Sequence, residues 1–254
     1  MDLGLDGRVY IVTGGSRGLG RAAAAALVAE GARVVLCSRD TAALEETAAG
    51  LGGSAVALPI PGDLAEEGLA ERLVASAHGR FGRLDGALAS VGGPPPGSAL
   101  EITTEQWEGS FRTVFLGPLR LATAVARSAG VEGASVVLVL STSVTQPLTG
   151  LAVSNGLRPG LAMVAKSLAD DLGPVGIRVN ALLPGRIDTD RSRELDDATN
   201  DPEATRQALE EQIPLHRYGQ PEEFGAVAAF LLSPAASYVT GTTVAVDGGL
   251  SRRP

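Results

Sequence analysis

The chain has 254 residues, of which 44% are hydrophobic and 20% are charged, and this is ample apolar material for a substantial core. Its formal net charge of −8 argues against nucleic acid or an anionic membrane surface as a partner. A single cysteine, Cys37, excludes an intramolecular disulfide and is expected to be a buried strand residue. There is no signal peptide, and no apolar stretch reaches the length of a membrane span, so we expect a cytoplasmic protein.

Apolar runs typical of buried strands alternate along the chain with amphipathic or alanine-rich helical runs. Strands that are apolar on both faces and are separated by helices indicate a parallel sheet covered on both sides. The pattern predicts an α/β fold, a Rossmann-type doubly wound sheet of about seven parallel strands, in a single domain over residues 1–254. The expected strands are 9–14, 33–38, 54–60, 84–90, 135–141, 177–183 and 242–249.

A glycine-rich stretch, TGGSRGLG (13–20), follows the first expected strand and precedes a helix. Gly14, Gly18 and Gly20 let the backbone turn tightly and approach a pyrophosphate. The helix that follows offers free N–H groups and the positive end of its dipole. In this position between strand and helix, the stretch predicts a dinucleotide site.

The tip of the second strand decides between a free ribose hydroxyl and a 2′-phosphate. An acid there binds the hydroxyl and repels phosphate, whereas an arginine pairs with phosphate. Here the strand ends in Ser38 and Arg39, and Arg17 lies in the glycine-rich stretch, which favours NADP(H) over NAD(H). Asp40, one position later, leaves NAD(H) open, and a further alternative is that both arginines are simply solvated.

Four motifs in order, TGGSRGLG, PGRIDT, GQPEEFGAVAAFLLSPAASYVTG and VDGG, resemble those of the short-chain dehydrogenase/reductase family, near its 3-oxoacyl-ACP-reductase-like members. The resemblance runs from about Leu5 to Gly249. It implies a nicotinamide cofactor at the carboxyl ends of the strands, a small-molecule substrate and a homo-oligomer, commonly a homotetramer. It also implies cofactor contacts at Gly14, Ser16, Arg17, Gly18, Leu19 and Gly20 in the turn, Asp63 and Leu64 beside the adenine, Ser90 and Gly92 after the fourth strand, and Pro184, Gly185, Ile187 and Thr189 beside the carboxamide.

The resemblance fails at the positions where the family places its catalytic residues. The family's NNAG after the fourth strand is replaced by ASVG (89–92), and its active-site asparagine falls on Val114. Its serine is retained as Ser141, but the tyrosine position, 13 residues later, holds Ser154, and the lysine position holds Arg158. Three of the four catalytic identities are therefore absent.

No Tyr-x-x-x-Lys motif elsewhere replaces them, and the single lysine, Lys166, is expected to be solvated or to face another subunit. Ser154 is a weaker and shorter acid than tyrosine, so it would have to relay a proton through water. Arg158 can bind the nicotinamide ribose and supply positive charge, but it does not release a proton near neutrality. General acid catalysis contributes roughly 10²–10⁴-fold and positioning about 7–11 kcal/mol, so we expect a slow enzyme and not an inert one.

Pro159 directly follows Arg158, and proline disfavours helical geometry at the residue before it. We predict that the helix here starts late or is kinked, with Ser154 and Arg158 on a loop. The proline-rich residues 92–97 are predicted to be stiff, and they form either one pocket wall or a rigid surface turn. The resemblance implies that residues of about 186–216 cap the substrate, so their mixed charges are expected to be specificity residues and solvated charges together.

We therefore expect an NADP(H)-dependent reductase or dehydrogenase of a carbonyl-type substrate with a non-standard proton donor. Ser141 would orient the acceptor oxygen, Arg158 would bind the ribose and stabilise negative charge, and Ser154 would relay the proton. Two alternatives remain: a cofactor-binding sensor or partner subunit without turnover, and a non-redox lyase or isomerase that uses the same pocket. No metal site is expected, and His78, His216, Trp107 and Phe111 are interpreted as structural.

Overall fold

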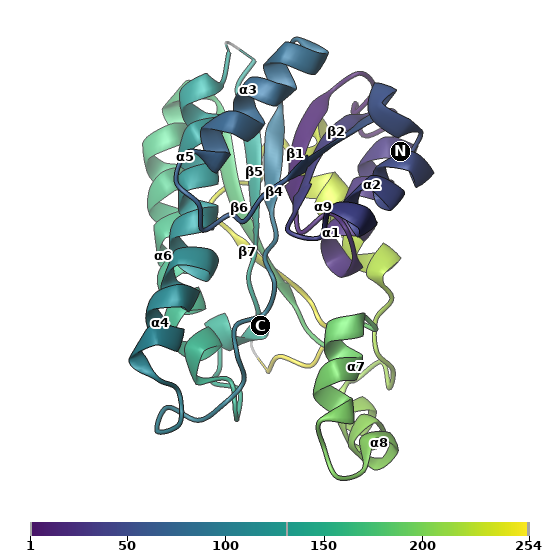
Figure 1. Ribbon diagram of the computed structural model, residues 1–254, viewed down its shortest axis with the longest axis vertical. Helices are drawn as coiled ribbons and strands as arrows, with labels where there is room; N and C mark the ends of the chain where they lie inside the picture. Colours follow the sequence, from purple (N-terminus) through teal and green to yellow (C-terminus); the bar gives the residue numbers. More distant parts are fainter. Residues whose placement is uncertain (1, 131, 253–254) are drawn as a thin grey trace.

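The computed structural model describes residues 2–130 and 132–252. Its centre is a parallel seven-stranded sheet in the order β3-β2-β1-β4-β5-β6-β7 (Figure 1). This confirms the predicted doubly wound sheet. The strands are β1 (Val9–Thr13), β2 (Arg33–Ser38), β3 (Ala57–Pro61), β4 (Gly86–Ala89), β5 (Ala134–Val139), β6 (Ile177–Pro184) and β7 (Thr243–Val246).

The strands are buried on both faces because their alternate side chains enter two separate cores. Val9 and Ile11 of β1 belong to one core, whereas Tyr10 and Val12 belong to the other. Cys37 of β2 lies in the first core, as predicted, and burial raises the pKa of its thiol to about 11. The sequence pattern that predicted a sheet covered on both sides is therefore explained by this alternation.

Helices cover both faces of the sheet (Figure 1). The alanine-rich α1 packs so closely on α9 that a Cβ on Gly225 would lie 2.6 Å from the carbonyl oxygen of Ala22. The helices of this face are α1 (Gly18–Ala29), α2 (Thr41–Gly50) and α9 (Pro221–Leu232). The opposite face carries α3 (Leu69–Phe81), α5 (Gly117–Ser128) and α6 (Ala152–Leu172), with the short α4 (Thr104–Ser110) leading through a π-helical turn (Phe111–Leu116) into α5.

A buried carboxylate ties the amino ends of the strands together. Asp85 accepts hydrogen bonds from Arg8, from Arg83 and from the main-chain N–H of Val9. Burial by itself opposes the charged carboxylate, but the hydrogen bonds and charges of these partners outweigh it, so the pKa of Asp85 is lowered. This cluster lies at the amino ends of β1 and β4, whereas the glycine-rich turn follows the carboxyl end of β1. We therefore interpret the cluster as structural.

The cap, residues 186–216, contains α7 (Asp190–Asp197) and α8 (Pro202–Gln212), which project beyond the carboxyl ends of the strands (Figure 1). Its two stems are bonded to each other: the N–H of Asp188 donates to the carbonyl of Gly219 at 2.8 Å, and the N–H of Gly219 donates to the carbonyl of Arg186 at 2.9 Å. The two ends of the cap are therefore held together.

The prediction that α6 starts late, with Ser154 and Arg158 on a loop, is wrong. The helix begins at Ala152 and continues through Pro159. A proline inside a helix costs about 3 kcal/mol or more. Fully buried apolar side chains such as Val153 and Leu161 each contribute about 1.5–3 kcal/mol, so the packing of α6 on the sheet outweighs the proline.

Candidate active site

The glycine-rich turn after β1 forms a compact cradle. Gly14 and Gly18 have φ values of 62° and 53°, a left-handed conformation that favours glycine. A Cβ on Gly20 would overlap the carbonyl oxygen of Gly14, and a Cβ on Gly14 would lie 2.9 Å from the carbonyl oxygen of Ser90. Every one of these positions therefore needs glycine for the backbone to fold this closely.

The helix that follows leaves its first N–H groups available. Arg17 is the N-cap residue of α1, is exposed, and makes no side-chain capping bond, while Leu19 lies in the first turn. Ser16 is buried, and its carbonyl accepts a hydrogen bond from Thr47 Oγ1 at 3.1 Å. An uncapped helix start next to a glycine turn fits the pyrophosphate of a dinucleotide.

The tip of β2 carries an exposed arginine, followed by an aspartate that caps the next helix. The Arg39 side chain is 71% exposed and lies 3.8 Å from Asp63. Asp40 caps α2 by accepting from the N–H of Ala43 at 3.1 Å, so its carboxylate is already bound. Ser38 donates to the carbonyl of Asp40 at 3.2 Å.

The side chain of Asp63 is partly exposed, whereas that of Leu64 is buried and cannot contact a ligand. The Leu64 side chain packs in the core, which leaves only its main chain for a contact with adenine. The Ile187 side chain is also buried, beside Gly219, so only its main chain is available for the predicted contact with the carboxamide. Gly185 lies so close to Asp247 that a side chain would not fit there, next to Pro184 at the end of β6.

The ends of β1 and β4 are bonded to each other. Thr13 Oγ1 donates to the carbonyl of Ser90 at 2.7 Å and accepts from the N–H of Ser90 at 3.0 Å. Beyond Ser90, the segment 92–97 ends at Gly97, whose N–H donates to the carbonyl of Gly150 at 2.7 Å. Gly97 also lines a hollow of about 430 Å³ together with Trp107. The end of this segment is therefore a wall of that hollow.

Ser141, two residues after the end of β5, has a hydroxyl proton available to donate in a hydrogen bond. It is half-buried, and its Oγ accepts from the N–H of Ser143 at 3.1 Å. A serine hydroxyl has one proton and two lone pairs, so this bond uses a lone pair and leaves the proton for another acceptor.

Ser154 points to a second serine. It is 4% exposed, and its Oγ lies 3.0 Å from Ser143 Oγ. The sequence analysis missed Ser143. Its position two residues after Ser141, in the stretch STS (141–143), is the feature of the sequence that indicates it.

Arg158 lies beneath Ser141 and is only 6% exposed. Its Nη1 donates to the carbonyls of Val139 and Leu140 at 2.8 and 2.7 Å, and its buried Nε has no partner among residues 2–130 and 132–252. Burial lowers the pKa of the guanidinium to about 10. The group is therefore still charged at neutral pH, and it places a positive charge at the end of β5.

The neighbours of Ser154 and Arg158 also have defined partners. The Asn155 amide holds the loop before α6 by accepting from the N–H of Leu148 at 3.0 Å and donating to its carbonyl at 2.8 Å. Gly156 allows Trp107 to approach α6, since a Cβ there would lie 2.9 Å from the indole ring. Sequence reasoning missed Asn155, because its partner is visible only in the folded loop.

Val114, at the position of the family's asparagine, is buried in the π-helical turn. Such turns occur frequently at functional sites. The π-helical turn is thus present although valine replaces the family's asparagine at position 114.

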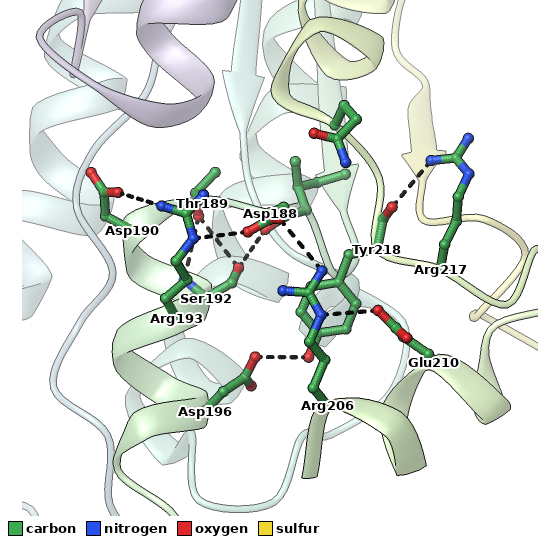
Figure 2. A network of polar contacts seen from close by, with 12 residues as sticks. Asp188, Thr189, Asp190, Ser192, Arg193, Asp196, Arg206, Glu210, Arg217 and Tyr218 are labelled. Atoms are coloured by element: carbon green, nitrogen blue, oxygen red, sulfur yellow. Dashed lines mark hydrogen bonds and ion pairs between the residues drawn. The ribbon is translucent and has the colours of Figure 1, made fainter. Parts of the chain in front are cut away.

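The cap begins beside the glycine-rich turn and is organised by ion pairs. Thr189 caps α7, and its Cγ2 atom lies 3.6 Å from where a Cβ of Gly18 would be. Figure 2 shows Asp188 bound by Arg193 and Arg206, at 3.0 and 3.4 Å. Thr189 and the start of the cap therefore lie beside the glycine-rich turn.

Tyr218 closes the cap network from the other side. Its hydroxyl donates to Asp196 at 3.0 Å, and the guanidinium carbon of Arg206 lies 4.4 Å from its ring centroid (Figure 2). Burial raises the pKa of Tyr218 to about 12. This phenol is therefore held by its contacts with the cap.

No group of three histidine, cysteine or acidic side chains is placed to hold a metal ion in residues 2–130 and 132–252. No helix among them is long and apolar enough to cross a membrane.

Comparisons with known proteins agree with this geometry. The family model described as enoyl-(acyl carrier protein) reductase matches residues 14–251. The chain is 35% identical to an L-rhamnose 1-dehydrogenase (NAD(P)(+)) of Azotobacter vinelandii, with 96% of each chain covered. It is also 35% identical to the rhamnolipids biosynthesis 3-oxoacyl-(acyl-carrier-protein) reductase of Pseudomonas aeruginosa, again with 96% of each covered. L-sorbose reductase from Gluconobacter frateurii, solved with NADPH and L-sorbose, superposes with a TM-score of 0.92 and 29% identity over all of both chains.

Proposed function

The chain belongs to the short-chain dehydrogenase/reductase family, and on that premise we propose that it is an NADP(H)-dependent reductase or dehydrogenase of a carbonyl-type substrate that works without the family's tyrosine. The observation that carries this proposal is the intact glycine cradle beside a hydrogen-bonded set of serines over a buried arginine. When bound, the cofactor supplies or accepts a hydride at the carbonyl carbon. The remaining chemistry, which orients the carbonyl and moves a proton, falls to the protein.

The adenine end supports NADP(H) as the cofactor. Asp40 caps α2 through Oδ1, which holds its carboxylate at the helix start and leaves only Oδ2 for a ribose 2′-hydroxyl. Arg39 and Arg17 are exposed and can turn toward a 2′-phosphate, which a guanidinium binds with two parallel hydrogen bonds. The similar L-sorbose reductase was solved with NADPH.

Ser141 is proposed to donate its free hydroxyl proton in a hydrogen bond to the substrate oxygen. Negative charge develops on that oxygen as a carbonyl is reduced, and a fixed positive charge nearby stabilises it. Arg158 supplies that charge from beneath Ser141. The ribose contact that the resemblance implies for Arg158 would require its other terminal nitrogen, because Nη1 is already bound twice.

Ser154 is proposed to relay the proton through Ser143. The two hydroxyls are bonded to each other, and Ser143 lines a hollow of about 230 Å³ that also contains Pro159. Water in that hollow would complete the path to solvent. Because such a relay is weaker than a phenol, strongly polarised acceptors such as quinones or iminium ions suit this site better than simple ketones.

Oxidation of NADPH in the presence of a panel of carbonyl compounds tests the proposal. We expect slow turnover that favours the most electrophilic acceptors, with large losses in Ser141→Ala and Arg158→Ala. Unchanged activity in both variants would refute the roles assigned to these residues.

A second candidate is a cofactor-binding protein without turnover, acting as a sensor or partner subunit. It is favoured by one observation: Ser154 and Arg158 are both buried and already bonded to internal partners. Tight NADPH binding with no oxidation by any acceptor, together with stable mixing with an intact homologue, would support it over the enzyme.

A homo-oligomer, as a dimer or tetramer, is also proposed. Phe111 is 40% exposed and stacks on Phe115, and Met163 of α6 is 71% exposed. Gly160, one turn before Met163, lies against Phe115, so these apolar side chains belong to one region of the surface. Light scattering of the purified protein measures the assembly directly, and a monomer would contradict this expectation.

A further inference from the structure

An arginine of the cap reaches across to the loop that follows β4. Arg191 lies in the first turn of α7, and its Nη2 donates to the carbonyl of Pro94 at 3.2 Å. These two residues are far apart in the sequence and belong to two segments that lie beyond the carboxyl ends of the strands. The contact therefore bridges the cap and the Pro-rich segment.

The backbone under this arginine is built to let it approach. A Cβ on Gly93 would lie 3.0 Å from Arg191 Nε and 3.5 Å from its Nη2. At the neighbouring Gly92, a Cβ would lie 3.9 Å from an Nη atom of Arg39. Two arginines from different elements thus lie over adjacent glycines, with Arg39 at the tip of β2 and Arg191 in α7.

Arg191 is weakly neutralised by its own surroundings. Its ion-pair partner in the described structure is Glu194, at 3.4 Å, and both side chains are substantially exposed. Its other hydrogen bond goes to a neutral carbonyl. Arg193, on the same helix, is instead held by two carboxylates, those of Asp188 and Asp190. An exposed pair of this kind is worth little, so Arg191 can exchange its partners at low cost.

We propose that Arg191 is an anion-binding residue at the carboxyl ends of the strands, beside the loop that follows β4. It exchanges its contact with the carbonyl of Pro94 for an anionic oxygen of a bound ligand. That oxygen belongs either to the diphosphate of the dinucleotide or to a carboxylate or phosphate of the substrate, since the guanidinium fork binds each of them in the same way. The inference rests on the proposed cofactor-dependent function.

The position of Thr189 makes the diphosphate one natural source. Thr189, two residues before Arg191, lies beside Gly18 of the pyrophosphate turn. The proximity of Gly93, directly after the ASVG stretch, makes the substrate the other source, because the family resemblance places the nicotinamide there. A diphosphate and a substrate anion predict different effects of the substitution Arg191→Gln.

Calorimetric titration of NADPH and of 2′-AMP, which lacks the diphosphate and the nicotinamide half, separates them. If the diphosphate is the source, Arg191→Gln weakens NADPH binding roughly 10- to 100-fold, the effect of losing a charge-assisted hydrogen bond, and changes 2′-AMP binding less than about twofold. Arg191→Lys retains part of the affinity. The control is Arg127→Gln, an exposed arginine in the last turn of α5 outside the cap, which leaves both affinities unchanged.

If the substrate is the source, NADPH binding by Arg191→Gln is unchanged. The preference for benzoylformate over its methyl ester, measured as the ratio of kcat/KM values, then falls roughly 10- to 100-fold. An unchanged NADPH affinity with an unchanged acid-to-ester ratio would overturn the proposal, as would an equal loss of NADPH and 2′-AMP binding. If neither compound is turned over, the NADPH titration alone decides.

NADPH binding by the wild-type protein separates the role of Arg191 from the proposed function. A wild-type protein that binds no NADPH contradicts the proposed function itself. A wild-type protein that binds NADPH no better than Arg191→Gln, and shows the same acid-to-ester ratio, contradicts only the role of Arg191.

Discussion

The buried Arg158 gives a sharp test of how this site works. In the variant Arg158→Met an unbranched apolar side chain replaces the guanidinium beneath Ser141. The change removes the positive charge and both hydrogen bonds to the carbonyls of Val139 and Leu140. It leaves the glycine cradle and the tip of β2 untouched.

The expected effect on stability is small because two large terms oppose each other. Two hydrogen bonds from a charged donor contribute about 1.5–3 kcal/mol each. Burying a charge without a counter-ion costs several kcal/mol, and Arg158 has no acidic neighbour among residues 2–130 and 132–252 that offsets this cost. We therefore expect the free energy of unfolding of Arg158→Met to stay within about 2 kcal/mol of wild type.

The expected effect on the reaction is large. Removing a fixed charge or donor that stabilises a developing oxyanion typically costs about 10²–10³-fold in kcat. NADPH affinity should change less than about tenfold, because Nη1 of Arg158 is bound to the main chain of β5 and not directed to a ligand. Urea denaturation, calorimetric NADPH titration and kcat for the most reactive acceptor of the panel are the three measurements.

Arg178 offers a matched control. It too donates to main-chain carbonyls, those of Leu231 and Ser233, and burial lowers its pKa, but it lies at the start of β6, away from Ser141. Arg178→Met should leave kcat unchanged. If Arg158→Met retains full kcat, or loses NADPH binding tenfold or more, the charge beneath Ser141 is not what the arginine supplies.

Three further changes test the cofactor site and the base of the sheet. Gly20→Ala should abolish measurable NADPH binding in calorimetry, because its Cβ would overlap the carbonyl oxygen of Gly14. Gly50→Ala is the control and should bind NADPH normally, because there is open space around its Cβ. Equal NADPH binding by the two variants would contradict the assignment of the glycine-rich turn as the dinucleotide site. Arg39→Gln should lower the ratio of NADPH to NADH affinity about tenfold, since one charged hydrogen bond to the 2′-phosphate is lost, and an unchanged ratio would argue for simple solvation of this arginine. Asp85→Asn should reduce the free energy of unfolding by roughly 1.5–3 kcal/mol at pH 7. Because the folded-state pKa of Asp85 is lowered, this contribution is fully present above the unfolded pKa of about 3.9 and is lost as the pH falls through the folded value, so the wild-type and Asp85→Asn denaturation curves should converge in acid.

The sequence by itself determined the sheet and the cradle. Runs that are apolar on both faces required cover from both sides, and the spacing of glycines after β1 required a tight turn at a helix start. These are local patterns, and their consequences were read from residues that are neighbours in the chain. The replacement of the family's catalytic residues by Ser154 and Arg158 was visible in the same way.

Only the tertiary structure decided what those replacements contact. The course of α6 through Pro159 depends on burial against the sheet, which outweighs a local preference. The pairing of Ser143 with Ser154, the attachment of Arg158 to β5, and the reach of Arg191 to Pro94 join residues from different elements. Such partners are selected by the packing of whole elements against each other, and no local pattern in the chain carries that information.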